Sequence, residues 1–297
     1  MAQAAPVVII INPISGAAGK NRGHARAQVA HAVVGDARVE ARIVVTEAAG
    51  HASALARDAA ASGARAVIAW GGDGTINEVG SVLAFGPVPL GIVPAGSGNG
   101  LARDLGIDRR PARAIAAALK ASPRTIDIGE IENRLFVNMT GAGIDAHIAR
   151  RFNAPENMRR GFLGYARITL DLLRSYVPAT YRITTGESRI EVRAVLVTIA
   201  NSSQFGNGAR IAPAARLDDG LLDLVVVGDR SAFSTLSQMP RLFTGRAERI
   251  PGCRFERVTD VTIETDQPMT FHVDGEPCEG GTRLHARVHP AALKVLA

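Results

Sequence analysis

The densest group of chemically capable residues in this chain lies in one eight-residue loop. It reads Gly-Gly-Asp-Gly-Thr-Ile-Asn-Glu and supplies the candidate binding residues Gly71, Gly72, Asp73, Gly74, Thr75, Asn77 and Glu78. Glycines let backbone N–H groups approach phosphate oxygens because no Cβ stands in the way. Asp73 would repel phosphate unless a divalent cation lay between them, so we predict that it binds a metal or a metal-bound water and takes part in catalysis. The alternative is a tight turn from strand to helix in which Asp73 caps the helix.

A second glycine-rich loop follows the apolar run 90–93 and reads Pro-Ala-Gly-Ser-Gly-Asn from position 94. Its candidate binding residues are Gly96, Ser97, Gly98 and Asn99. Two glycine loops at neighbouring strand ends can hold two sides of one nucleotide. By itself this loop is weak evidence, since Gly-Ser-Gly is common in ordinary turns.

The third element, Asn-Pro-Ile-Ser-Gly, ends the first apolar run and contributes Asn12, Pro13, Ser15 and Gly16 as candidate binding residues. Lys20 and Arg22 follow it. A polar turn followed by basic residues could face phosphate or lipid head groups. For Lys20 and Arg22 alone, a solvated loop with a helix cap is an equally good interpretation.

Alternating strands and helices would position these three loops. We expect strands at 7–11, 37–45, 66–70 and 90–93, and helices at 22–34, 51–61, from 75 onward, and at 112–120. This alternation predicts an α/β domain with a parallel sheet and glycine-rich nucleotide loops over residues 1–122. Open sheets of this kind bind ligands beyond the carboxyl ends of their strands, where all three loops lie.

The pattern changes after about residue 123. Segments rich in Val, Ile, Thr and Arg predict strands at 124–131, 135–140, 180–185, 190–200, 221–227, 254–265, 269–273 and 283–288. We therefore expect a β-rich domain, an antiparallel sandwich, over residues 123–289. One amphipathic helix is expected at 162–176.

Composition narrows the class of protein. Hydrophobic residues make up 46% of the chain and charged residues 21%, as in folded globular proteins. The formal charge of +6 favours an anionic partner, but no dense basic block with interleaved aromatic residues occurs, so we expect no nucleic acid partner. The two cysteines lie outside any CxxC or zinc spacing, which predicts a cytoplasmic setting. No apolar stretch is long enough to span a bilayer, so we expect any membrane contact to be peripheral.

Taken together and in this order, the three loops resemble the diacylglycerol kinase catalytic-domain family, which includes bacterial lipid kinases and the sphingosine kinases. The complete set of three motifs is specific, and the resemblance covers essentially the whole chain. It implies a kinase that uses ATP and Mg²⁺ and transfers the γ-phosphate to a hydroxyl of a membrane lipid. It also implies that the tail, 290–297, returns to the first domain and that the active site lies in the cleft between the domains.

The resemblance gives a role to the acidic segment 216–221, Arg-Leu-Asp-Asp-Gly-Leu. It implies that Asp219 binds Mg²⁺ through its side chain, while Arg216 and Leu221 contribute backbone carbonyls, which are hard oxygen ligands. From the residues alone, an Asp-Gly hairpin turn would be the preferred interpretation.

The segment His-Val-Asp-Gly-Glu is similar to the family's catalytic carboxylate motif. A kinase must relieve the attacking hydroxyl of its proton, and either Asp274 or Glu276 could be the base. The residues do not decide between the two, and an Asp-Gly turn is again the alternative. By similarity, Thr46, just after the second strand, would contact the nucleotide.

The second loop departs from the common bacterial pattern. Gly100 stands where the family often has Asp, and Ser97 replaces the commoner Thr. This version is closer to the sphingosine kinases and leaves the acceptor open: diacylglycerol, a sphingoid base or another long-chain alcohol would fit. The oligomeric state is open as well, with a homodimer among the possible assemblies.

A cluster of arginines precedes the expected amphipathic helix and forms a candidate membrane-docking patch with two apolar residues: Arg150, Arg151, Arg159, Arg160, Phe162 and Leu163. From the residues alone, a solvated cluster at a helix end is a slightly better interpretation.

Two other functions are possible alternatives to the lipid kinase. An NAD kinase-like enzyme would share the Gly-Gly-Asp-Gly loop, but the other two loops count against it. A nucleotide-regulated lipid-binding protein would not need the intact carboxylates at 73, 219, 274 and 276.

Overall fold

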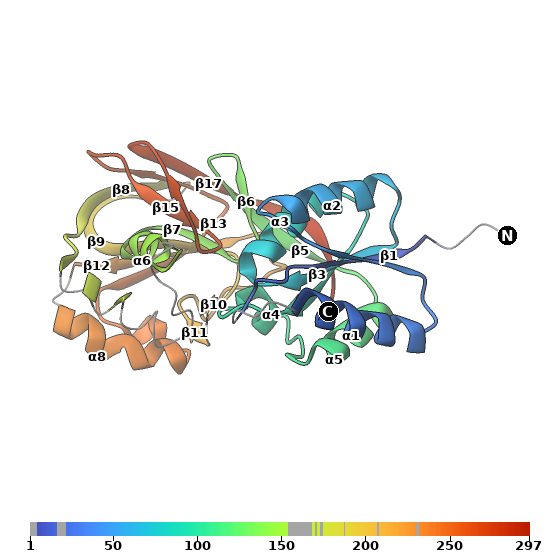
Figure 1. Cartoon of the computed structure of the whole chain (residues 1–297). Helices are drawn as coiled ribbons and strands as arrows, with labels where there is room; N and C mark the ends of the chain where they lie inside the picture. Colours follow the sequence, from blue (N-terminus) through green and yellow to red (C-terminus); the bar gives the residue numbers. More distant parts are fainter. Residues whose placement is uncertain are drawn as a thin grey trace. The chain divides into compact units, whose positions relative to one another are not determined.

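The structure is a computed structural model of the 297-residue chain. It describes residues 5–16, 22–153, 168, 169, 171, 172, 175–186, 188–206, 208–229 and 232–297. The chain divides into two compact units, one made of Met1–Ile126 together with Ala291–Ala297, and the other of Asp127–Pro290 (Figure 1). Lys20, Arg159, Arg160, Phe162, Leu163 and most of the helix expected at 162–176 lie outside the described residues.

A parallel sheet forms the centre of the first unit. Its strands are β1 (Val7–Ile11), β2 (Ala41–Val45), β3 (Ala66–Gly71), β4 (Leu90–Pro94) and the end of β17 (Arg283–Leu296). They pair in the order β2-β1-β3-β4-β17, and each of these pairings is parallel. β1, β3 and β4 are buried along their whole length, which explains why their sequences are continuous apolar runs.

Helices cover both faces of this sheet. They are α1 (Arg22–Asp36), α2 (His51–Ala61), α3 (Asp73–Leu83), α4 (Gly100–Asp104) and α5 (Pro111–Lys120). α1 packs against α5 on one face, and α2 packs against α3 on the other (Figure 1). The predicted α/β alternation is confirmed, although the short helix α4 was not predicted and several element ends differ. α3 begins at Asp73 and not at Thr75. β2 begins at Ala41 and not at Ala37, because the N–H groups of residues 37–39 bond back to the last turn of α1.

The second unit is built mainly from antiparallel strands. They are β5 (Arg124–Ile131), β6 (Arg134–Phe136), β7 (Met139–Gly143), β8 (Ala179–Thr185), β9 (Arg189–Ala200), β10 (Gln204–Gly206), β11 (Ala209–Arg210), β12 (Leu222–Gly228), β13 (Cys253–Val258), β14 (Asp260–Glu264), β15 (Thr270–Val273), β16 (Glu276–Glu279) and the first part of β17. The long strand β9 pairs with β7, β8 and β12, so it connects most of the sheet. The predicted β-rich second domain is therefore confirmed.

Two segments predicted as single strands are each divided in two. The segment 135–140 breaks between β6 and β7, because the N–H groups of Val137 and Asn138 bond to the side chain of Asp274 instead of a neighbouring strand. The segment 254–265 breaks at Thr259. β13 pairs with β12, whereas β14 pairs with β8 and β17.

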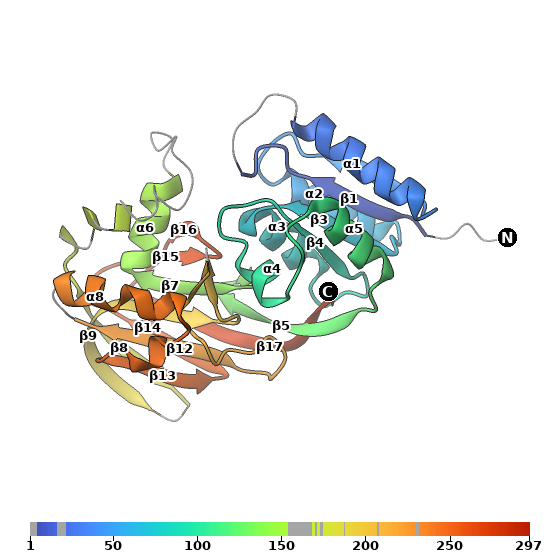
Figure 2. The same cartoon turned by 90° about the horizontal axis from the view of Figure 1, so that it is seen from below.

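Two helices of the second unit were not predicted. They are α6 (Ile144–Asn153) and α8 (Ala232–Phe243), which lie beside the strands (Figure 2). Ile144 and Ile148 of α6 belong to an apolar cluster with residues of β9 and β12, and Leu242 of α8 packs against the same cluster. Among the helices that the structure describes, none has the length and hydropathy needed to cross a bilayer.

Candidate active-site residues

The three predicted loops of the first unit follow β1, β3 and β4, which are hydrogen-bonded neighbours in the sheet. Because these strands are parallel, their carboxyl ends meet at one edge and the loops come together there. A Cβ built on Gly72 would lie 3.2 Å from the Cα of Gly96, and one built on Gly16 would lie 2.7 Å from the carbonyl oxygen of Ala95. The glycines therefore allow the three loops to touch one another.

Asn12 joins the first loop to the middle loop. Its Nδ2 donates a hydrogen bond to Thr75 Oγ1 at 2.8 Å, and its Oδ1 accepts the N–H of Ile14 at 3.0 Å. Gly71 provides the space for Thr75, because a Cβ at Gly71 would fall 2.3 Å from the Thr75 Cβ. Two residues predicted to bind the ligand, Asn12 and Thr75, thus also fix each other.

Asp73 joins the middle loop to the second glycine loop. Its carboxylate accepts the backbone N–H of Asn99 at 2.9 Å and that of Gly100 at 2.8 Å. Burial raises the pKa of Asp73, and these backbone N–H groups act in the opposite direction. Each carboxylate oxygen already has one partner, so a positioning role for Asp73 has direct structural support. Its roles in metal binding and catalysis stay predictions.

The second glycine loop closes on itself through Asn99, which adopts φ +51°. Asn99 Oδ1 accepts the N–H of Gly96 at 2.8 Å, and Asn99 Nδ2 donates to the carbonyl oxygen of Gly96 at 2.7 Å. Ser97 is exposed at the tip of the closed loop. Asn99 therefore shapes the loop with its side chain, while Ser97 is exposed to solvent.

Arg26 on α1 holds the first loop, and the sequence analysis missed it. Its guanidinium donates to the carbonyl oxygen of Asn12, to Ser15 Oγ at 2.9 Å and to the Ser15 carbonyl oxygen at 2.8 Å. It also lies over the Trp70 ring, 5.7 Å from the ring centroid. Burial lowers the pKa of Arg26, and the charge of Arg22 lowers it further. Nothing local in the sequence marks this arginine among those of a polar helix.

If the loops bind ATP as the sequence predicts, Arg26→Lys should raise the KM for ATP about 3- to 10-fold and lower the free energy of unfolding by about 1–2 kcal/mol. An ammonium group cannot reproduce the planar fork that holds both Asn12 and Ser15. Steady-state kinetics and thermal melts measure the two effects. Arg42→Lys, at an exposed position of β2, is the control and should change neither quantity. An unchanged KM in Arg26→Lys would show that the loop keeps its shape without the fork.

Two other predicted binding residues have structural partners. The Glu78 carboxylate accepts the N–H groups of Gly50 at 3.4 Å and Ser53 at 3.3 Å, at the start of α2. Thr46 is buried directly after β2, and its N–H donates to the carbonyl oxygen of Ile11 at 2.8 Å. Glu78 thus supports the N-terminus of α2, which is a stabilising place for a negative charge.

In the second unit, Asp274 is a buried carboxylate with a full set of backbone partners. It accepts the N–H groups of Val137, Asn138 and Met139, each at 2.9 Å, and its backbone has φ +48°. These bonds hold the connection between β6 and β7. Glu276, by contrast, is exposed at the start of β16. The structure therefore separates the two carboxylates that the sequence could not distinguish.

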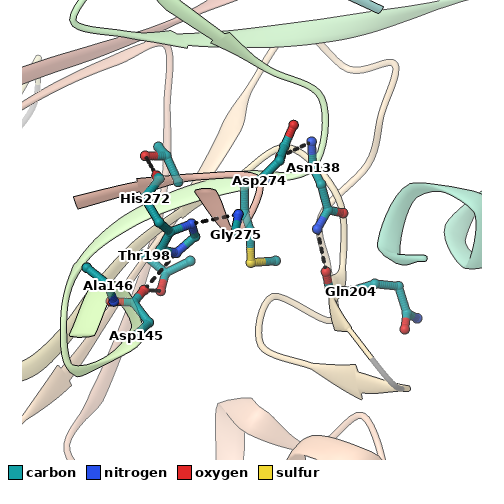
Figure 3. A network of polar contacts seen from close by, with 10 residues as sticks. Asn138, Asp145, Ala146, Thr198, Gln204, His272, Asp274 and Gly275 are labelled. Atoms are coloured by element: carbon teal, nitrogen blue, oxygen red, sulfur yellow. Dashed lines mark hydrogen bonds and ion pairs between the residues drawn. The ribbon is translucent and has the colours of Figure 1, made fainter. Parts of the chain in front are cut away.

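Behind this turn lies a buried pair formed by Asp145 and His272 (Figure 3). His272 Nε2 lies 3.1 Å from Asp145 Oδ2, and His272 Nδ1 accepts the N–H of Gly275 at 3.2 Å. Asp145 also accepts the N–H of Ala146 at 2.7 Å and the hydroxyl of Thr198 at 3.4 Å. From the sequence, His272 is visible only as part of the carboxylate motif, and no role is predicted for Asp145.

The predicted metal loop, 216–221, is held by Asp127, another residue that the sequence analysis missed. Asp127 Oδ2 accepts the N–H of Gly220 at 2.7 Å, and the Asp127 N–H donates to the carbonyl oxygen of Leu217 at 2.6 Å. An acidic residue between apolar neighbours in a predicted strand was the available signal. Asp219 Oδ1 accepts the N–H of Leu221 at 3.1 Å, and Asp219 Oδ2 forms an ion pair with Arg257.

The charges around this loop do not form a dense acidic cluster. Among the described residues, no group of three or more His, Cys, Asp or Glu side chains is placed to hold a metal ion. Burial raises the pKa of nearby Asp223 to about 6, although the charge of Arg257 lowers it. The predicted donors, one carboxylate and two backbone carbonyls, are all hard oxygens of the kind that suits Mg²⁺ with several retained waters.

Two family models divide the chain between them. The diacylglycerol kinase catalytic domain matches residues 6–131, and the YegS C-terminal NAD kinase beta sandwich-like domain matches residues 138–297. This chain is a YegS-type member of the diacylglycerol kinase family. The family predicted from the three glycine-containing loops is thereby confirmed.

Curated YegS-type relatives match along most of their length. One from Chromohalobacter salexigens, named "Probable lipid kinase YegS-like", is 33% identical over 85% of this chain and 82% of its own. One with the same name from Pseudomonas aeruginosa PAO1 is 33% identical over 93% of this chain and 91% of its own. A solved structure described as a diacylglycerol kinase from Bacillus anthracis strain Sterne shares the fold, with a TM-score of 0.73 at 20% identity, over 98% of this chain and 96% of that one. The two curated relatives are thus named as probable lipid kinases, and their names specify no acceptor.

The YegS-type family assignment does not test the candidate docking patch. Arg150, on α6, forms an ion pair of 3.0 Å with Glu279, and both side chains are more than half exposed. Such a pair contributes little to stability, because water and salt screen it. A membrane role for Arg150 and Arg151 therefore stays a prediction.

Proposed function

We propose that this protein is a lipid kinase that transfers the γ-phosphate of ATP to a hydroxyl of a lipid at a membrane surface. The observation that carries the proposal is the contact of three loops at the carboxyl ends of β1, β3 and β4. Gly72 and Gly96 meet there without side chains between them. Glycine loops beside the start of α3 suit the phosphates of a nucleotide, because no Cβ keeps the phosphate oxygens away from the backbone.

In this proposal, the first unit binds and orders the nucleotide. Asn12, Thr75, Asp73 and Asn99 tie the loops to one another, so little has to move when phosphates bind. Such preorganisation reduces the entropy cost of binding. The exposed hydroxyl of Ser97 and the backbone of Gly98 and Gly74 are the groups we assign to direct contact with the nucleotide.

Phosphoryl transfer depends mainly on positioning and on neutralising charge, and Mg²⁺ supplies charge neutralisation at the phosphates. We assign Asp219 and the backbone carbonyls of Arg216 and Leu221 to holding this ion, because they are hard oxygen donors on a turn that Asp127 fixes. Arg257 now neutralises Asp219, so the side chain of Arg257 would have to yield its place.

Glu276 is the group that we assign as general base. The Asp274 carboxylate accepts hydrogen bonds from three backbone N–H groups. If Asp274 left these bonds to act on a substrate, the connection between β6 and β7 would lose its support. Glu276, by contrast, is exposed at the start of β16, whereas Asp274 is buried. A base must come within hydrogen-bond reach of the proton that it removes, which favours the exposed carboxylate.

The test is phosphate transfer from labelled ATP and Mg²⁺ to acceptors in mixed micelles. The panel contains a diacylglycerol, a sphingoid base, a long-chain alcohol and, as a non-lipid acceptor, NAD. We expect one lipid to be labelled.

Asp219→Asn should raise the Mg²⁺ concentration for half-maximal rate about 10-fold or more, since a charged hard ligand is lost. Asp218→Asn is the matched control, because Asp218 is exposed and pairs only loosely with Arg216, at 3.4 Å.

Each contrary outcome has a definite meaning. Labelling of NAD without any lipid would replace the proposal with an NAD kinase. Tight lipid binding without any transfer would indicate a binding protein. An equal Mg²⁺ requirement in both aspartate variants would remove Asp219 from the metal site while leaving the kinase in place.

A further inference from the structure

We propose that His272 is a positioning residue that holds the turn Asp274–Gly275 and thereby aims Glu276. This inference rests on the proposed function, because it assumes that Glu276 acts on an acceptor hydroxyl. His272 touches neither substrate nor nucleotide in this proposal. It acts through the backbone of the turn.

The turn requires support because both of its residues adopt left-handed backbone conformations. Asp274 has φ +48° and Gly275 has φ +87°. Glycine adopts such an angle freely, but a residue with a side chain does so at a cost that the surroundings must offset. On one side, the Asp274 carboxylate accepts three backbone N–H groups. On the other side, the N–H of Gly275 donates to His272 Nδ1.

The hydrogen bonds of His272 select one tautomer. Nδ1 accepts a hydrogen bond from the Gly275 N–H, so Nδ1 must carry a lone pair; Nε2 then carries the ring hydrogen and donates a hydrogen bond to Asp145 Oδ2. Asp145 is itself fixed by the N–H of Ala146 and the hydroxyl of Thr198. The backbone of Gly141 passes so close that a Cβ there would fall 2.4 Å from Asp145 Oδ2. Figure 3 shows the sequence of contacts from Asp145 through the imidazole to Gly275.

Through these contacts, β7 and α6 fix the position of Gly275, the residue before Glu276. Both members of the pair are nearly inaccessible, with His272 4% and Asp145 3% exposed, so water cannot replace the imidazole easily. A carboxylate base that is displaced by about 1 Å can lose two orders of magnitude in rate. The pair therefore has a role in the reaction even though it lies behind the surface.

Two substitutions separate the two hydrogen bonds of the ring. His272→Asn places an oxygen near the position of Nδ1 and can still accept the Gly275 N–H. His272→Gln places an amide near the position of Nε2, keeps the contact with Asp145 and loses the bond to Gly275. We expect His272→Gln to lower kcat about 10- to 100-fold with KM for ATP within about twofold of the wild type, and His272→Asn to recover most of kcat. Melting temperatures identify any variant that simply fails to fold.

A measurement without turnover completes the test. In protein labelled with ¹⁵N at histidine, the His272 ring nitrogens should show a protonated Nε2 and an unprotonated Nδ1. The opposite tautomer, or equal kcat in the two variants at equal melting temperature, would overturn the inference. Failure of the wild type to label any lipid would instead overturn the proposed function, and with it the assignment of Glu276, while the tautomer would still report whether His272 holds the turn.

Discussion

Glu276→Gln should lower kcat for phosphate transfer by about 100- to 10,000-fold, with the melting temperature and the KM for ATP unchanged. The amide has nearly the same shape as the carboxylate but cannot take the proton of the attacking hydroxyl. Glu276 is exposed at the start of β16, so its substitution should not disturb a packed region. Steady-state kinetics with the lipid identified in the micelle assay measure the effect.

Asp274→Asn should behave differently, because it removes a buried acceptor that three backbone N–H groups share. The amide turns an N–H donor toward other donors, so we expect a loss of about 3–5 kcal/mol in the free energy of unfolding together with the loss of activity. Glu279→Gln, on the same strand as Glu276 and exposed, is the control and should leave kcat nearly unchanged. A stable Asp274→Asn with a selective loss of kcat, beside an active Glu276→Gln, would reverse our assignment of the base.

Gly96→Ala should raise the KM for ATP more than about tenfold and reduce the free energy of unfolding by about 1–3 kcal/mol. Its Cβ would lie 2.7 Å from the Cα of Gly72 and 3.1 Å from Asn99 Oδ1, so the second loop would have to move away from the middle loop. The neighbours closest to the new atom include backbone, which cannot rotate aside as a flexible side chain can. Steady-state kinetics and thermal melts measure the two effects.

Gly35→Ala is the matched control for this glycine. Gly35 is exposed within α1, and a Cβ there would meet nothing within 4 Å. Alanine should therefore stabilise the protein by up to about 1 kcal/mol through its higher helix propensity and leave ATP binding unchanged. Equal KM values for the Gly96 and Gly35 variants would show that the contact between the loops is not needed for the nucleotide.

The helices and strands of the first unit could be predicted from the sequence because the residues within each element already show whether it is buried and where it ends. β1, β3 and β4 are buried on both faces, so their apolar runs and the glycine loops that end them are visible without any partner. The strand predictions of the second unit were less accurate at their ends. The break at Val137–Asn138 depends on Asp274, which lies 137 residues away in the chain, and no local periodicity records such a contact.

Long-range hydrogen bonds likewise explain the missed residues of the candidate site. Arg26 looks like any arginine on a polar helix until Asn12 and Ser15 are placed beside it. Asp145 and His272 are separated by 127 residues, yet they form one buried pair. Asp73 and Asn99 were predicted as ligands of the same nucleotide, but the direct bond between them was not predicted.

The sequence by itself determined the parallel α/β unit, the β-rich unit, the family and the three loops, because apolar runs, alternation and glycine motifs are properties of short segments. Only the tertiary structure decided which carboxylate is hydrogen-bonded to the backbone and which is exposed. Asp274 and Glu276 are both carboxylates, only two positions apart, so the sequence does not tell their roles apart. That decision follows from the N–H groups of Val137, Asn138 and Met139, which meet Asp274 only after the chain has folded.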